Sequence, residues 1–112
     1  MACDAIARFQ RLEGSEVTFI TGVDEHGLKI QRTAESKNKQ PKEHCDLVST
    51  EYKDLWNKWN ISNDVFIRTT ESTHINVVYN FFNKVVNSND IYMGQQKGWY
   101  CVGCEEFKEI KN

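Results

Sequence analysis

Three titratable side chains lie close behind one apolar segment of the sequence. The segment EVTFITG spans Glu16–Gly22, and Asp24, Glu25 and His26 begin two residues later. An apolar run without alternation is typical of a strand covered on both faces. Ligands of an open α/β sheet bind outside the carboxyl ends of its strands. The pattern is therefore consistent with a binding site, and Gly22 and Gly27 leave the backbone free to turn on either side of it.

The same side chains also have a purely structural explanation. Asp24 is placed to cap a helix that begins near Leu28, since Asp is a favoured N-cap residue. Glu25 and His26 would then face water. Spacing alone favours this explanation over a binding site.

Cys101 and Cys104 have the C-x2-C spacing of one zinc knuckle. Two thiolates on a tight turn fill two positions of a tetrahedral shell, and a structural zinc site needs four ligands. The other cysteines and histidines show no matching second pair: Cys3, His26, His44, Cys45 and His74. The sequence therefore predicts half of a zinc site.

A thiol oxidoreductase is the competing interpretation of this C-x-x-C pair. Such a site needs a helix after the first cysteine and further strands, and only eight residues follow Cys104. Glu105 and Glu106 are also expected to raise the thiol pKa values rather than lower them. Two ordinary hairpin thiols are therefore favoured over a redox site. For the other candidates, we expect Cys45 in the core, and His44 and His74 at the surface or at helix ends.

Length and composition limit the class of protein. The chain has 112 residues, of which 39% are hydrophobic and 27% charged, with a net charge of −2. One soluble domain without a membrane-spanning segment is expected, and binding of nucleic acid by bulk charge is not. Four irregularly spaced cysteines argue against a secreted disulfide framework and for a reducing compartment.

The periodicity predicts two strands among four helices. Apolar residues recur at helical spacing in 2–12, 28–36 and 41–59 and in a fourth helix capped by Thr70, while 16–22 and 64–68 are expected to be strands. This order predicts a parallel sheet with right-handed crossovers. From Ile91 a different subdomain is expected, with a small hairpin made of Ile91–Met93, a turn at Gly94–Gly98 and the segment Trp99–Cys104.

Three stretches carry a family resemblance. They are FITGVDEHGLKI at 19–30, DVFIRTTE at 64–71 with His74, and DIYMGQQKGWYCVGCEEF at 90–107. Together they closely resemble methionyl-tRNA synthetases, which are class I aminoacyl-tRNA synthetases, and EHCDLVS at 43–49 is closer to the bacterial and organellar branch. The resemblance implies an α/β fold. Residues 1–89 would form a partial Rossmann-like, nucleotide-binding catalytic domain with a parallel sheet and flanking helices, and 90–112 would start a zinc-knuckle β-hairpin insertion.

The resemblance also implies partners and residue roles. The parent enzyme would use ATP with Mg to activate methionine and would then transfer it to tRNA(Met), in the cytoplasm of a bacterium or in a mitochondrion or plastid, without a membrane partner. Asp24 corresponds to the acid that pairs with the substrate α-ammonium, and His26, in the same motif, would be a second substrate-binding residue that lines the active site. Cys101 and Cys104 correspond to the first two ligands of a structural zinc knuckle.

Several parts that the family uses are expected outside this sequence. A first strand with a His-Ile-Gly-His type signature would precede Ala2, and a Lys-Met-Ser-Lys-Ser type loop and a second zinc-ligand pair would follow Asn112. We therefore expect a ligase fragment that is inactive alone, has no catalytic residue of its own and is marginally stable because its sheet is open at one edge. The alternative is a non-catalytic fragment that binds methionine weakly, or binds a chain that carries the missing half.

Overall fold

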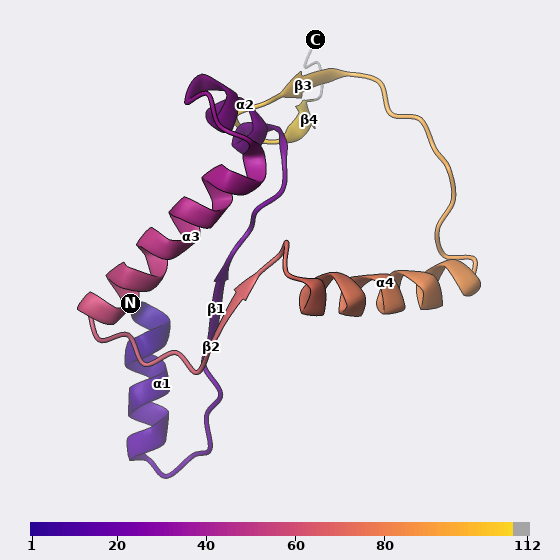
Figure 1. The fold of residues 1–112 in the computed structure, drawn as a ribbon. Coiled ribbons are helices and arrows are strands. Elements are labelled where there is room, and N and C mark those ends of the chain that lie inside the picture. The colour runs from indigo at the N-terminus through magenta and orange to yellow at the C-terminus, as the bar shows by residue number, and fades with distance from the viewer. Residues whose placement is uncertain (109–112) are drawn as a thin grey trace.

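Helices and short strands alternate along the chain in the computed structural model, which describes residues 1–108. The elements are α1 (Ala2–Leu12), β1 (Ile20–Val23), α2 (Leu28–Ser36), α3 (Pro41–Lys58), β2 (Val65–Arg68), α4 (Ser72–Asn87), β3 (Trp99–Cys101) and β4 (Glu106–Lys108). Figure 1 shows β1 and β2 side by side, with the helices around them. The α/β class and the order of the first six elements are as the sequence predicts.

β1 and β2 form the predicted parallel pair. Their register runs from Ile20 opposite Val65 to Val23 opposite Arg68. β1 is shorter than the predicted strand 16–22, because β2 offers only four residues for pairing. Just before β1, the Asp64 carboxylate accepts a hydrogen bond from the Phe19 amide at 2.7 Å, and the Phe19 carbonyl accepts one from the Asp64 amide at 2.9 Å.

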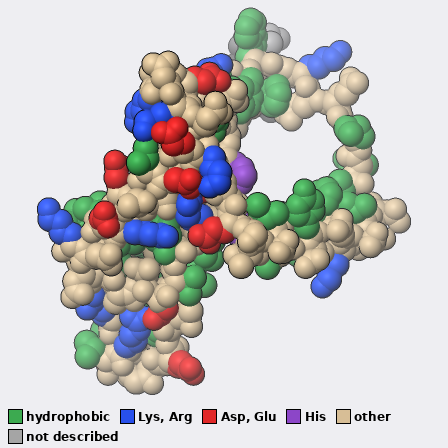
Figure 2. All heavy atoms as spheres, viewed as in Figure 1, with side chains coloured by type: hydrophobic (Ala, Val, Ile, Leu, Met, Phe, Trp, Pro, Cys, Tyr) green, Lys and Arg blue, Asp and Glu red, His purple; other side chains and the backbone are tan. Residues whose placement is uncertain are grey.

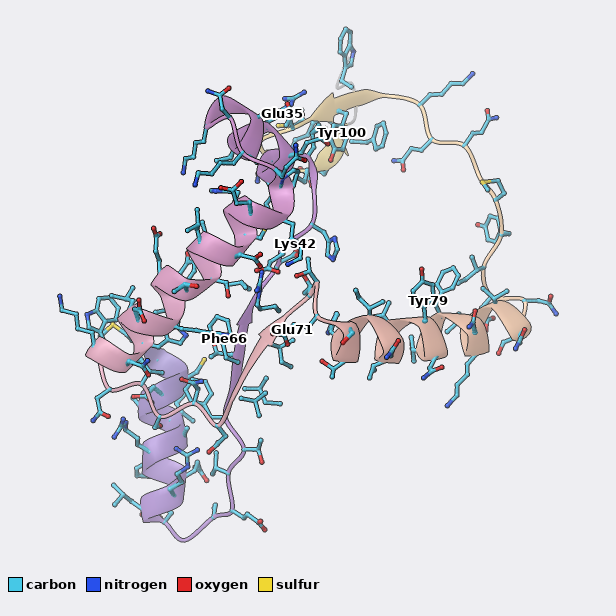
Figure 3. All side chains as sticks on the ribbon, viewed as in Figure 1. Glu35, Lys42, Phe66, Glu71, Tyr79 and Tyr100 are labelled. Carbon is cyan, nitrogen blue, oxygen red and sulfur yellow. The ribbon has the colours of Figure 1, made fainter. Side chains whose placement is uncertain are left out.

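α3 lies along one side of this strand pair (Figure 1). Pro41 occupies its first turn, where a residue without an N–H costs nothing. Phe66 points from β2 toward α3 (Figure 3), and its ring lies 5.1 Å from the ammonium group of Lys53. Cys45 is buried on the inner side of α3, so its predicted place in the core is confirmed.

α1 has the predicted bounds, and polar contacts hold it to the loop before β2. Asp4 accepts hydrogen bonds from the amide and hydroxyl of Ser62, at 2.7 and 2.6 Å. These bonds, with that from Arg8, lower the pKa of Asp4 to about 2. Arg11 reaches the same loop, with a 2.7 Å ion pair to Asp64.

α4 begins two residues later than the predicted cap. Its N-cap is Glu71, which makes no side-chain capping bond, so the predicted capping role of Thr70 is wrong. The Thr70 hydroxyl donates instead to the carboxylate of Glu25. α4 extends away from the strand pair (Figure 1), and hydrophobic side chains are visible along its surface in Figure 2.

The hairpin is real, but it lies further along the chain than predicted. β3 pairs with β4 in antiparallel register, Trp99 opposite Lys108 and Cys101 opposite Glu106. Residues 91–98 form neither the predicted strand nor the predicted turn, because β3 takes its partner from the residues after Cys104. The predicted unit 90–112 extends past the described residues, since 109–112 lie outside them.

Few large side chains are buried in this arrangement. Within residues 1–108 the buried hydrophobic residues are Ala7, Ala34 and Cys45. The accessible surface is 9393 Å², whereas a compact monomer of this mass exposes about 6400 Å². The radius of gyration is 18.7 Å, against about 13 Å for a compact domain of this length.

We therefore predict that the isolated chain is marginally stable. A dye that binds apolar surface should bind strongly and without added denaturant, and the thermal transition should be broad. Calorimetry and dye fluorescence on the purified chain test this. A sharp, cooperative melt of a monomer without dye binding would contradict it.

Candidate functional site

Asp24 lies at the carboxyl end of the strand pair, as the sequence predicts for a binding residue. It follows the last residue of β1, and Thr69 follows the last residue of β2. The Thr69 hydroxyl accepts a hydrogen bond from the Glu25 amide at 2.9 Å. The same hydroxyl donates a hydrogen bond to Oδ1 of Asp24 at 3.4 Å. The His26 amide donates to the same oxygen at 3.3 Å. Oδ1 is thus held by two donors, while Oδ2 has no hydrogen-bond partner within residues 1–108.

The structural alternative for these residues fails on two counts. The N-cap of α2 is Gly27, with φ 109°, and no side chain caps that helix, so Asp24 is not a capping residue. Glu25 does not face water, because it is only 7% exposed. His26 is exposed, as this alternative predicts, and its Nε2 lies 3.2 Å from the carbonyl oxygen of Thr69.

The sequence places Glu25 either in a binding site or facing water, and what it did not predict is the buried ion pair that Glu25 forms with Arg68. Its Oε1 accepts a 2.8 Å bond from Nε of Arg68, and its Oε2 accepts a bond from the Thr70 hydroxyl. The pKa of Arg68 is raised, first by Glu25 and then by Asp46. Side chains of an extended segment alternate in direction, and an arginine ends the neighbouring strand. Together these two features are the signal that could have indicated a buried ion pair.

The strand end lies between two hollows of the surface. One, of about 420 Å³, lies between β1 and α3 and is lined by residues that include Asp24, Glu25, Cys45, Tyr52, Trp56 and Phe66. The other, of about 440 Å³, is lined by His26 and Thr69 together with α4 side chains that include His74, Val78 and Phe82. Small ligands bind in concave sites with few polar groups, and both hollows reach the loop that carries Asp24.

The remaining histidines differ in position. His44 lies in the first turn of α3, as one alternative predicts, but it is buried rather than at the surface. His74 lies near the start of α4 and is half-buried. Neither belongs to a potential metal site, because within residues 1–108 no three His, Cys, Asp or Glu side chains are grouped to hold an ion.

The structure brings Cys101 and Cys104 together on the β3–β4 hairpin. The Cys104 amide donates to Sγ of Cys101 at 3.4 Å. The pKa of Cys101 is lowered, chiefly by hydrogen bonds from the thiol and amide of Cys104, and the pKa of Cys104 is raised by Cys101. The expectation that the neighbouring glutamates raise both pKa values is thus wrong for Cys101, and the rise for Cys104 comes first from Cys101 and not from a glutamate. Cysteine sulfur on a tight turn is a ligand type that zinc prefers.

Comparisons with known proteins agree along the whole chain. The family model "tRNA synthetases class I (M)" matches residues 1–110. A methionine-tRNA ligase of Synechocystis is 52% identical over 112 residues, which are 100% of this chain and 21% of the relative. The chloroplastic/mitochondrial methionine-tRNA ligase of Arabidopsis thaliana is 50% identical over 111 residues, which are 99% of this chain and 18% of the relative.

A solved structure shares the fold. The methionyl-tRNA synthetase of Mycobacterium tuberculosis bound by methionyl-adenylate matches with a TM-score of 0.90 and 37% identity, over 96% of this chain and 21% of that one. This likeness bears out the Rossmann-like α/β class. The zinc knuckle at the hairpin stays a prediction.

These matches cover nearly all of this chain but only a part of each relative. This chain spans about one fifth of the length of the ligases it matches. Within residues 1–108, no helix combines the length and the apolar character that crossing a bilayer requires. Because the family model covers nearly every residue, the chain belongs to the methionine-specific class I tRNA synthetases.

Proposed function

We propose that these residues act as part of a methionine-tRNA ligase. The ligase activates methionine with ATP and Mg to give methionyl-adenylate, and it transfers the methionyl group to tRNA(Met). The observation that carries this proposal is the identity of about one residue in two with such ligases along the entire chain. Contacts to ATP phosphates and tRNA are assigned to the part of the ligase that this chain does not span. The location would be the cytoplasm for a bacterial ligase, or a mitochondrion or plastid for an organellar one.

We assign to Asp24 the role of binding the α-ammonium group of the substrate. Its Oδ1 is fixed by the Thr69 hydroxyl and the His26 amide, so the carboxylate presents Oδ2 in a defined direction. A charge-assisted hydrogen bond to an ammonium group is about twice as strong as a neutral one. The position of Asp24 beyond the end of β1 is where ligands of open α/β sheets bind.

His26 is assigned to the wall of the same site. When Nε2 carries the proton, it donates to the Thr69 carbonyl, and Nδ1 is then a hydrogen-bond acceptor. His26 and Thr69 also line the hollow beneath α4. The side chain therefore links the Asp24 loop to that hollow.

Cys101 and Cys104 are assigned two of four positions on a structural zinc ion, which would fix the hairpin when bound. The donor set fits, because both sulfurs lie on one turn and thiolates suit zinc. The described residues supply no further pair of ligands.

We predict that the isolated chain binds zinc weakly, or that two chains share one ion. Tight structural zinc binding depends on four protein ligands, so Cys101→Ser should abolish what binding there is. Cys3→Ser, at an exposed cysteine on α1, is the matched control. Metal titration combined with sizing tests this, and a tight one-to-one site lost in Cys101→Ser would contradict the half-site.

A hybrid ligase tests the proposed function. In it, residues 1–112 replace the aligned 112 residues of the Synechocystis ligase. We expect the hybrid to catalyse methionine-dependent exchange of pyrophosphate into ATP, while the isolated chain shows no exchange above a heat-inactivated control. The rate without methionine is the background for both.

Two outcomes would contradict the proposal. One is a hybrid that is folded by circular dichroism yet shows no exchange. The other is a hybrid whose exchange depends on a different amino acid.

A further inference from the structure

The buried carboxylate of Glu25 has no place in the proposed substrate contacts. Both of its oxygens are occupied within the protein, one by Arg68 and the other by Thr70. Its side chain is 3% exposed, so a substrate cannot reach it without displacing these partners. A role for Glu25 must therefore act through its neighbours.

Arg68 extends these contacts to α3. Its Nη2 donates to Oδ1 of Asp46 at 2.5 Å, and Nζ of Lys42 lies 3.0 Å from Oδ2 of Asp46. Lys42 lies beside the strand ends in Figure 3. We call Glu25, Arg68, Asp46 and Lys42 the strand-end network. It joins the loop after β1, the last residue of β2 and the first turns of α3.

The network is balanced in charge. It contains two carboxylates and two cations, and the pKa of Asp46 is lowered by Arg68 and then by Lys42. A buried carboxylate that loses its cation is strongly destabilised. The ion pair with Arg68 therefore keeps the Glu25 side chain directed into the protein.

The direction of Glu25 determines that of Asp24. Residues 24–26 continue β1 without helix or turn structure, and consecutive side chains of an extended segment point to opposite sides. Glu25 is buried, and its neighbours Asp24 and His26 are both exposed. Thr69, which holds Oδ1 of Asp24, lies between Arg68 and Thr70, the two residues that hold Glu25.

We propose that the strand-end network is a positioning device for the Asp24 carboxylate, and that Glu25 contributes to methionine binding without touching methionine. This inference rests on the proposed function, in which Asp24 binds the α-ammonium. Glu25 and Arg68 are thus positioning residues. Their effect on the substrate passes through Asp24 and Thr69.

The test compares variants of the hybrid ligase in the exchange assay. Glu25→Gln keeps the size of the side chain and removes its charge. We expect the methionine KM to rise about tenfold, the effect of one weakened charge-assisted bond. The ATP KM and kcat should each change by less than about twofold, because ground-state contacts to ATP are not altered.

A second background shows whether Glu25 acts through Asp24. Residues that act as one unit are not additive in a double-mutant cycle. In a hybrid that already carries Asp24→Ala, adding Glu25→Gln should therefore not raise the methionine KM further. A full tenfold rise in that background would overturn the proposal.

Asp46→Asn keeps the proposal testable if Glu25→Gln does not fold, because the Asp46 side chain is 45% exposed. It should raise the methionine KM in the same selective way by about threefold, since Arg68 loses one of two partners. The matched control is Asp54→Asn on the same helix, which should leave all three constants unchanged. A fall in kcat together with a rise in both KM values would show a merely structural role and overturn the proposal.

The two levels of inference fail differently. If Asp24→Ala leaves the methionine KM unchanged, the proposed role of Asp24 is wrong, and the positioning role fails with it. If Asp24→Ala raises the methionine KM and neither Glu25→Gln nor Asp46→Asn does, only the positioning role is wrong.

Discussion

Asp24→Ala in the hybrid ligase is expected to raise the methionine KM by roughly 30- to 1000-fold, which corresponds to about 2–4 kcal/mol of lost binding. The substitution removes the carboxylate that we assign to the substrate α-ammonium. The ammonium group would then be desolvated without a counter-charge. The ATP KM should change little, because we assign Asp24 to the amino acid and not to the phosphates.

Exchange kinetics at varied methionine and varied ATP measure both effects. Asp54→Ala on α3 is the control for a lost surface carboxylate. Because Gly27 and not Asp24 occupies the N-cap of α2, a capping defect cannot produce the effect. An equal rise in the KM for methionine and in the KM for ATP would instead assign Asp24 a role in folding.

Gly22→Ala is expected to disrupt the strand pair and abolish exchange. A Cβ at Gly22 would lie 2.2 Å from the carbonyl oxygen of Ile67 and 3.0 Å from its carbonyl carbon, both in the backbone of β2. Backbone cannot move aside as a flexible side chain can, so the strands must separate. The cost should be at least the ~1–3 kcal/mol that is typical of overpacking.

The thermal midpoint of the hybrid ligase measures this cost. Gly94→Ala is the control, since its Cβ would meet only a side-chain carbon of Tyr92 at 3.9 Å. Separation of the strands would also move Asp24, which follows β1 directly. A Gly22→Ala hybrid with the midpoint and exchange rate of the Gly94→Ala hybrid would show that β1 and β2 are further apart than the structure places them.

Local patterns predicted the helices well. α1 and α2 begin and end where their apolar spacing indicates, and α3 ends one residue before the predicted Trp59. Each helix carries its periodicity and its boundary signals within its own sequence. The sequence also predicts that the backbone turns at Gly27, and the structure has a positive φ of 109° there, which glycine adopts readily.

Contacts between distant segments were the harder part. The length of β1 depends on how many residues β2 offers, and the reason for Gly22 is the backbone of Ile67, 45 positions along the chain. The same holds for Glu25, whose burial requires Arg68 and Thr70. For the hairpin, β3 could pair forward or backward, and the local sequence does not distinguish the two directions.

A crystal structure of the hybrid ligase with bound methionine tests the role of Asp24 most directly. We predict that the methionine α-nitrogen lies about 2.7–3.2 Å from a carboxylate oxygen of Asp24, the range of a hydrogen bond. The Thr69 hydroxyl should still contact Oδ1 in that complex. A methionine whose ammonium group pairs with another acid, with the Asp24 carboxylate beyond hydrogen-bonding distance, would contradict the assignment of this site.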